Sequence, residues 1–172
     1  MSARRAVAWV LLFVALGGVG GGLLSCGGGG PAFGPRQTLR ATVTRVVDGD
    51  TVHVRVAGRD ETVRYIGIDT PESVKPGTPV QCFAKAASAY NRRLVAGQDV
   101  VLRTDAESRD RFGRLLAYVY RRRDGLFVNA ALVRAGFATI LTIPPNLAHA
   151  AQLQRLERAA RLTERGLWRA CR

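Results

Sequence analysis

Apolar and polar residues alternate along three stretches of the chain after residue 38. In the middle stretch, Val52, Val54 and Val56 alternate with polar residues, which is the period of a half-buried strand. Turn-forming residues rich in aspartate and glycine separate the stretches. The pattern therefore predicts an antiparallel meander of three strands. These strands are expected over residues 39–47, 51–56 and 61–68.

The later part of the chain alternates between helical and extended patterns. Helices are predicted over 79–95, 127–135 and 147–162, and short apolar runs at 100–103 and 115–120 predict two more strands. Three strands, a helix and two strands are the order of the OB-fold barrel. We therefore expect an α+β fold that is mainly β: a five-stranded OB-fold barrel with a helix between strands three and four and two further C-terminal helices. Such barrels commonly bind nucleic acid, but a fold alone does not define a function.

The first 25 residues have the features of an export signal. Arg4 and Arg5 precede an apolar run over 6–16. This run is too short for a membrane-spanning helix of about 20 residues, but it has the proportions of a signal peptide. The residues before Cys26 look like a bacterial lipobox, so we expect lipidation of Cys26. Ordinary cleavage nearby and an uncleaved anchor are the alternatives.

Each of these alternatives places the domain outside the cytoplasm, as an envelope-attached lipoprotein or a secreted protein. The expected organisation is a signal peptide over 1–25, a Gly/Pro-rich linker over 26–38 and one domain over 39–172. The membrane would meet the protein only through an N-terminal lipid or signal anchor, and we expect a monomer.

The chain is strongly basic. It has 26 Lys and Arg against 13 Asp and Glu, a formal net charge of +13, and Lys75 and Lys85 are its only lysines. Arginine presents a planar fork that suits phosphate, so the excess indicates a polyanionic partner. The alternative is a genome that favours arginine codons everywhere, because the arginines are spread along the chain.

Two cysteines remain once Cys26 is assigned to lipid. Export to an oxidising compartment favours a disulfide between Cys82 and Cys171, with two unrelated thiols as the alternative. A metal site of cysteine and histidine is not expected, because His53 and His149 are the only histidines and no CxxC pair occurs.

Three acidic residues lie at predicted strand ends. Asp50 comes at the start of the second strand, Asp69 at the end of the third, and Glu72 shortly after it. Neighbouring antiparallel strands can bring Asp50 and Asp69 together, where two carboxylates repel unless a cation intervenes. Oxygen ligands favour Ca²⁺ or Mg²⁺ over zinc. The alternative for each acid taken singly is turn formation or capping.

Two arginines strengthen the interpretation of these acids as a site. Arg64 lies in the third predicted strand, on the side that it shares with Ile66 and Ile68. An arginine that points inward is costly without an anionic partner. Arg114 begins the fifth strand directly after a glycine. Hydrolysis of a phosphodiester needs a water nucleophile, a group that orients or deprotonates it, a cation, and donors for the developing charge. Two arginines, two metal-binding acids and a spare glutamate would supply these roles.

Motifs along the whole predicted domain carry a family resemblance. DGDT over 48–51 is followed by Arg64, by DTPE over 69–72 and by DRFGR over 110–114. In this order and spacing the chain resembles the staphylococcal nuclease (thermonuclease) family over about residues 39–170. The full set of similar segments is 46–51, 63–72, 109–118, 128–133 and 166–168.

The resemblance implies a calcium-dependent nuclease that binds one Ca²⁺ ion and acts on DNA or RNA. By position, Asp50 and Asp69 would hold the ion through their carboxylates, and Thr70 through its backbone carbonyl.

The resemblance also implies the catalytic roles. Glu72 would orient or deprotonate the attacking water, while Arg64 and Arg114 would grip the scissile phosphate and stabilise the transition state. In-line attack would leave 3′-phosphorylated products. Arg111 would meet a substrate phosphate.

The chain departs from the family pattern where the substrate base would bind. Arg111 and Phe112 stand where the family prototype has a lysine and a tyrosine, and no tyrosine occurs near 141–143, where the prototype has the tyrosines that flank the base. The Cys82 and Cys171 positions resemble an exported bacterial branch of the family, which supports a disulfide.

Two other functions are consistent with the same sequence. One is an OB-fold module on the cell envelope that binds nucleic acid with weak or no cutting. The other is a structural envelope lipoprotein whose charge reflects only codon usage.

Overall fold

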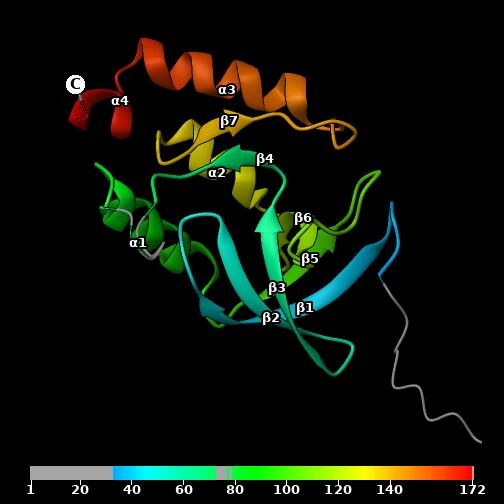
Figure 1. Cartoon of the computed structure of the whole chain (residues 1–172). Coiled ribbons are helices and arrows are strands. Elements are labelled where there is room, and N and C mark those ends of the chain that lie inside the picture. Colours follow the sequence, from blue (N-terminus) through cyan, green and yellow to red (C-terminus); the bar gives the residue numbers. More distant parts are fainter. Residues whose placement is uncertain (1–32, 73–76, 78, 172) are drawn as a thin grey trace, which may run out of the picture. The chain divides into compact units, whose positions relative to one another are not determined.

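The computed structural model describes residues 33–72, 77 and 79–171 (Figure 1). The chain divides into two units, and all of these residues belong to the second, Ala32–Arg172. The predicted signal peptide and the lipidation site Cys26 lie outside the described residues. Among the described helices, none is long and apolar enough to span a membrane.

Five strands close into a barrel, which confirms the predicted OB-fold class. Their order around the barrel is β1-β2-β3-β6-β5. The pairing of β3 with β6 is parallel, and the other pairings are antiparallel. The strands are β1 (Thr38–Val46), β2 (Thr51–Val56), β3 (Arg59–Tyr65), β5 (Asp99–Arg103) and β6 (Leu115–Arg121).

The alternating valines of the strands fill the barrel. Val52, Val54 and Val63 are fully buried, because alternate residues of a strand point to the same face. The polar residue Arg55, which lies between the inward positions of β2, is exposed. The hydrophobic pattern of the sequence therefore defines both the strands and their inner face.

The predicted strand over 61–68 is wrong in one respect, because the structure divides it in two. β3 ends at Tyr65, and β4 (Gly67–Asp69) leaves the barrel to pair with β7 (Thr139–Leu141). Gly67 has a φ of 79°, and a Cβ there would lie 2.8 Å from Leu153 Cδ1, so glycine permits both the bend and the close approach. Asp69 consequently ends a small outer sheet rather than a barrel strand.

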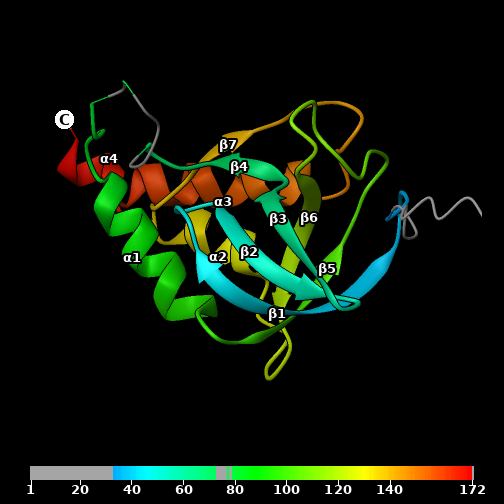
Figure 2. The ribbon, with the colours of Figure 1, turned by 60° about the horizontal axis from the view of Figure 1, so that its bottom comes forward.

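The described residues form four helices, which are α1 (Ala84–Val95), α2 (Val128–Arg134), α3 (Ala150–Leu162) and α4 (Leu167–Ala170). Of these, α1, α2 and α3 pack against strands of the barrel or the small sheet. In Figures 1 and 2, β4 and β7 run alongside α3, and α1 flanks the barrel.

The predicted helices over 79–95 and 147–162 both begin later in the structure, the second of them at Ala150 as α3. α1 begins at Ala84 and not at residue 79, because Phe83 takes a positive φ of 68° directly before it. The short helix α4 was not predicted. It precedes Cys171, which forms a disulfide with Cys82 (S–S 2.05 Å, Cα–Cα 5.9 Å).

The last residues of the predicted linker pack on the barrel. Phe33 is 8 % exposed and belongs to the hydrophobic core. Ser108 Oγ donates to the Phe33 carbonyl oxygen over 2.7 Å, and the Gln37 N–H donates to Thr104 Oγ1 over 2.8 Å. The packed barrel domain therefore includes residues ahead of β1.

Candidate active site

The turn between β1 and β2 carries the first predicted site residue. The N–H groups of Val47 and Asp48 both donate to the Thr51 carbonyl oxygen, over 3.0 and 3.1 Å. A Cβ on Gly49 would lie 2.6 Å from Thr70 Oγ1, so only glycine lets Thr70 approach this turn. The turn is thereby packed directly against the segment that carries the second acid.

Asp50 is almost completely buried, at 6 % exposure. Its Oδ2 accepts from the Thr70 N–H over 2.7 Å and from Thr70 Oγ1 over 2.9 Å. The same oxygen lies 3.1 Å from Arg64 Nη1. Burial raises the pKa of Asp50 above its ordinary value, although the charge of Arg64 and the Thr70 hydrogen bonds act in the opposite direction.

Arg64 connects the two predicted metal-binding acids. Its side chain is 13 % exposed, and Nη2 lies 2.6 Å from Asp69 Oδ1 while Nη1 faces Asp50. Nη1 also donates to the carbonyl oxygens of Ile68 and Tyr65, over 2.9 and 3.2 Å. One guanidinium group therefore brings Asp50 and Asp69 to the same place, although Asp69 comes from β4 and not from a barrel strand.

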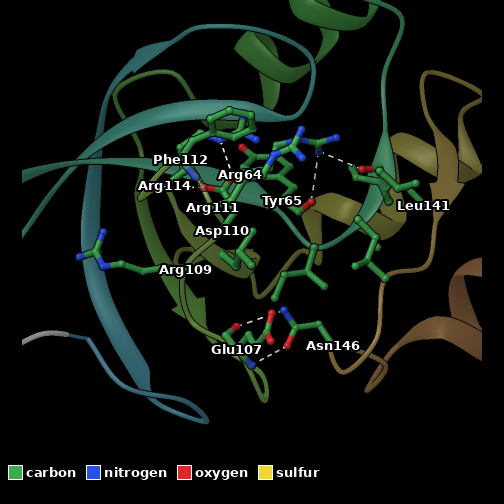
Figure 3. Close-up of a pocket in the computed structure, with 15 residues that line it drawn as sticks. Arg64, Tyr65, Glu107, Arg109, Asp110, Arg111, Phe112, Arg114, Leu141 and Asn146 are labelled. Carbon is green, nitrogen blue, oxygen red and sulfur yellow. Dashed lines mark hydrogen bonds and ion pairs between the residues drawn. The ribbon is translucent and has the colours of Figure 1, made fainter.

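Arg114 faces a pocket that Arg64 also lines. The pocket measures about 540 Å³, and in Figure 3 Arg64, Arg111, Phe112 and Arg114 gather at one end of it. Arg114 Nε lies 2.6 Å from Asp110 Oδ2, a partner that the sequence analysis did not identify. Asp110 lies four residues before Arg114, and that spacing within a short loop was the available signal.

Phe112 is an exposed aromatic residue, with 69 % of its surface accessible. The guanidinium carbons of Arg111 and Arg114 lie 4.8 and 5.5 Å from its ring centroid. Leu141 and Ile143 also line the pocket and are exposed. The predicted substrate-binding residue Arg111 thus lies at the same pocket as both predicted arginines, beside an apolar surface.

Glu72 and Thr70 lie on the segment that leaves β4. Thr70 is buried on Asp50, and Glu72 is half-buried two residues later. The Glu72 main chain pairs with Gln81: its N–H donates to Gln81 Oε1 over 2.8 Å, and its carbonyl oxygen accepts from the Gln81 N–H over 3.0 Å. Neither Glu72 nor Asp50 is among the residues that line the pocket.

A second network of buried hydrogen bonds links the turn between β1 and β2 to α1. Asp48 Oδ1 accepts from Ser88 Oγ over 2.7 Å, and Asn91 Nδ2 donates to the Asp48 carbonyl oxygen over 3.0 Å. Asn91 Oδ1 in turn accepts from the Tyr65 hydroxyl over 3.1 Å. Ser88 and Asn91 belong to α1, so this helix fixes the turn that carries Asp50. Asp48 therefore has a supporting role beyond the turn that the DGDT motif over 48–51 indicates.

The donors around Arg64 fit a hard cation. Within the described residues, no group of three or more His, Cys, Asp or Glu side chains converges as a metal site. The carboxylates of Asp50, which is buried, and Asp69, which is about half exposed, nevertheless meet at the guanidinium group of Arg64. Calcium accepts carboxylate, carbonyl and water oxygens together, so two carboxylates suit it where water can complete the coordination.

Fold and site together define an OB-fold barrel protein with an acid pair bridged by Arg64 and a second arginine, Arg114, at the same pocket. A model of the family described as staphylococcal nuclease homologue matches residues 62–170. The chain belongs to this family, which confirms the predicted resemblance.

Three relatives illustrate the similarity. The chain is 41 % identical over 126 residues to the thermonuclease of Staphylococcus intermedius, covering 73 % of this chain and 74 % of that protein. It is 37 % identical over 126 residues to the thermonuclease of Staphylococcus hyicus, covering 73 % of each. It is 36 % identical over 135 residues to endonuclease YncB of Bacillus subtilis, covering 77 % of this chain and 63 % of the relative.

Proposed function

We propose that the chain is a calcium-dependent nuclease that hydrolyses phosphodiester bonds of DNA or RNA. The observation that carries this proposal is the Arg64 guanidinium, which joins Asp50 to Asp69 and also lines the pocket that Arg114 faces. Relatives named thermonuclease and endonuclease support the reaction class.

One Ca²⁺ would be held by Asp50, Asp69 and the Thr70 backbone carbonyl. When bound, such an ion neutralises charge on phosphoryl oxygens and lowers the pKa of an associated water. The buried Asp50 is suited to this role because a cation would stabilise the charged form of a carboxylate whose pKa burial has raised.

The chain's own residues would perform the remaining steps. Glu72 would orient the attacking water and accept its proton. The water oxygen would bond to phosphorus as the bond to the 5′ oxygen breaks. The departing oxygen would take up a proton from solvent and Glu72 would return its proton to solvent, leaving a 3′-phosphate and a 5′-hydroxyl. Arg64 and Arg114 would stabilise the charge on the phosphoryl oxygens, and Arg114 would assist the departing 5′ oxygen.

The pocket surface gives the proposed substrate its remaining contacts. Arg111 would bind a neighbouring phosphate, because its guanidinium lies at the pocket and is exposed. Phe112, Leu141 and Ile143 present apolar surface there, on which a base can stack or pack without hydrogen bonds. We therefore propose weak base selectivity.

We further propose that the protein is exported, either secreted or held at the envelope by lipid on Cys26. These proposals rest on the apolar run over 6–16 and the residues that precede Cys26. Mass spectrometry of the exported protein tests them, because a diacylglyceryl group on Cys26 would distinguish a lipoprotein from a secreted chain.

One digestion experiment tests the proposed activity. The chain from residue 27 onward is incubated with DNA or RNA and Ca²⁺, with and without a chelator, beside an Asp50→Asn control. We expect cutting that the chelator abolishes, with 3′-phosphate ends. Binding without cutting would instead support an OB-fold nucleic-acid-binding module, and neither activity would favour a structural envelope protein.

A further inference from the structure

Two hydrogen bonds tie the main chain of Glu72 to one residue, Gln81. The Glu72 N–H donates to the Gln81 side-chain oxygen over 2.8 Å, and the Gln81 N–H donates to the Glu72 carbonyl oxygen over 3.0 Å. Both main-chain groups of Glu72 are thus held by Gln81. One of the two bonds depends on the glutamine side chain and can be removed by substitution.

Gln81 is itself fixed by its neighbours. Its carbonyl oxygen accepts from the Ala84 N–H over 3.1 Å, at the first residue of α1. The next residue, Cys82, forms the disulfide with Cys171. The ring of Phe83 stacks on Phe137 with 5.1 Å between centroids. A helix start, a covalent bond and an aromatic stack therefore anchor three consecutive residues.

The chain before Glu72 is held equally firmly. Two residues earlier, the Thr70 N–H and hydroxyl both bind Asp50. Glu72 therefore lies between two anchored residues. One is Thr70, which binds Asp50, and the other is Gln81, which lies just before α1. A group that must orient a water needs this support, because a displacement of about 1 Å can lower a rate by about 100-fold.

We propose that Gln81 is a positioning residue, which holds Glu72 at the distance from the acid pair that the reaction requires. This inference rests on the proposed function. Gln81 is not among the residues that line the pocket, so its loss should affect the chemical step and leave substrate binding nearly unchanged.

Three variants test the role of Gln81 in the chain from residue 27 onward. Gln81→Ala removes the side-chain oxygen that accepts from the Glu72 N–H. Gln81→Glu retains an acceptor oxygen at the same distance from the main chain. Gln154→Ala removes an exposed glutamine from α3 and serves as the matched control. We expect kcat of Gln81→Ala to fall on the order of 10-fold with KM within about twofold. Gln81→Glu and Gln154→Ala should remain within about threefold of the parent kcat.

A readout independent of activity accompanies the kinetics. Amide hydrogen exchange at Glu72 should be faster in Gln81→Ala than in the parent chain, and unchanged in Gln81→Glu and Gln154→Ala. Thermal unfolding of each variant separates a local change from a general loss of stability.

The outcomes distinguish the two proposals. Unchanged kcat in Gln81→Ala, an equal loss in Gln81→Glu, or unchanged Glu72 exchange would overturn the positioning role while the parent chain still cuts. A parent chain that does not cut overturns the proposed nuclease function, and the positioning role with it, even if the exchange rates change as expected.

Discussion

Arg64 gathers the acids of the site because a guanidinium group carries five donors in a rigid fork. Its two terminal nitrogens face different carboxylates, Asp50 and Asp69, and one of them also reaches main-chain oxygens. With the Arg64 side chain 13 % exposed and that of Asp50 8 % exposed, neither charge is fully hydrated, and each depends on the other. Lysine, with one compact charge, could not make this set of contacts.

Glu72 offers the clearest test at the scale of single residues. Glu72→Gln keeps the size of the side chain and removes its ability to accept a proton. We expect kcat to fall by about 10²–10⁴-fold, while the Kd for an oligonucleotide stays within about threefold. Steady-state kinetics and fluorescence anisotropy measure the two quantities.

Glu164→Gln, an exposed glutamate that follows α3, is the control for Glu72→Gln and should retain the parent kcat. Equal losses of turnover and binding in Glu72→Gln would contradict a role in the chemical step.

At the scale of elements, hydrophobic periodicity predicted the barrel strands but not the point where the third one leaves the barrel. The buried apolar positions change from Val63 and Tyr65 to Ile66 and Ile68, so the alternation shifts by one residue where the chain changes sheet, a signal that a single continuous strand over 61–68 overlooks. The positive φ of Gly67 and its contact with Leu153 decide it, and that contact forms only after α3 has packed. The start of α1 was misplaced for a similar reason, because Phe83 is held by stacking on Phe137.

In the site, too, some residues could be predicted from local motifs, whereas others are defined only by contacts between distant segments. Motifs identified Asp50, Arg64 and Asp69 as candidates, since each lies in a recognisable segment. The supporting residues Asn91 and Gln81 belong to no such motif. Contacts within the folded chain reveal them, between Asn91 on α1 and the Asp48 main chain and between Gln81 and the Glu72 main chain. Contacts between distant segments cannot be read from spacing alone.

The link between α1 and the turn can be tested through stability. Asn91 is fully buried and bonds both Tyr65 and the Asp48 main chain. Asn91→Ala leaves two buried polar groups without their partner, so we expect a loss of about 2–4 kcal/mol in the free energy of unfolding. Urea denaturation measures it.

Arg92→Ala changes an exposed neighbour on the same helix, and should alter the free energy of unfolding by at most about 0.5 kcal/mol. If both variants were equally stable, the buried network would not be a support for the turn.

At the scale of the whole molecule, the disulfide joins the segment before α1 to the end of α4. It spans 89 residues of sequence, and closing so long a loop restricts the unfolded chain. It also connects the described C-terminus to the residues that hold Glu72. Cys82 therefore carries the disulfide and directly follows Gln81, the residue that binds the Glu72 main chain.

Removing the disulfide should lower stability measurably. For the double variant Cys82→Ser with Cys171→Ser we expect a loss of about 2–4 kcal/mol, which corresponds to a fall in Tm of about 5–15 °C for a chain of this size. Scanning calorimetry measures it. Reducing agent should lower the Tm of the parent chain similarly and leave the double variant unchanged. A parent Tm that resists full reduction would contradict this prediction.

The net charge of +13 is not concentrated at the pocket, because the arginines beside the pocket are largely balanced by neighbouring acids. Arg114 pairs with Asp110, and Arg109 with Glu61. A polyanion would therefore be attracted chiefly by the dispersed positive charge, an attraction that salt screens.

The Glu72→Gln variant permits a binding measurement without cutting. For a single-stranded oligonucleotide we expect log Kd to rise with log salt at a slope of about 3, equivalent to about four phosphates. This corresponds to roughly 50-fold weaker binding at 200 mM than at 50 mM salt. A peptide nucleic acid of the same base sequence has no backbone charge and should show no such slope. A flat salt dependence for the charged strand would mean that the arginine excess reflects codon usage and not recognition of a polyanion.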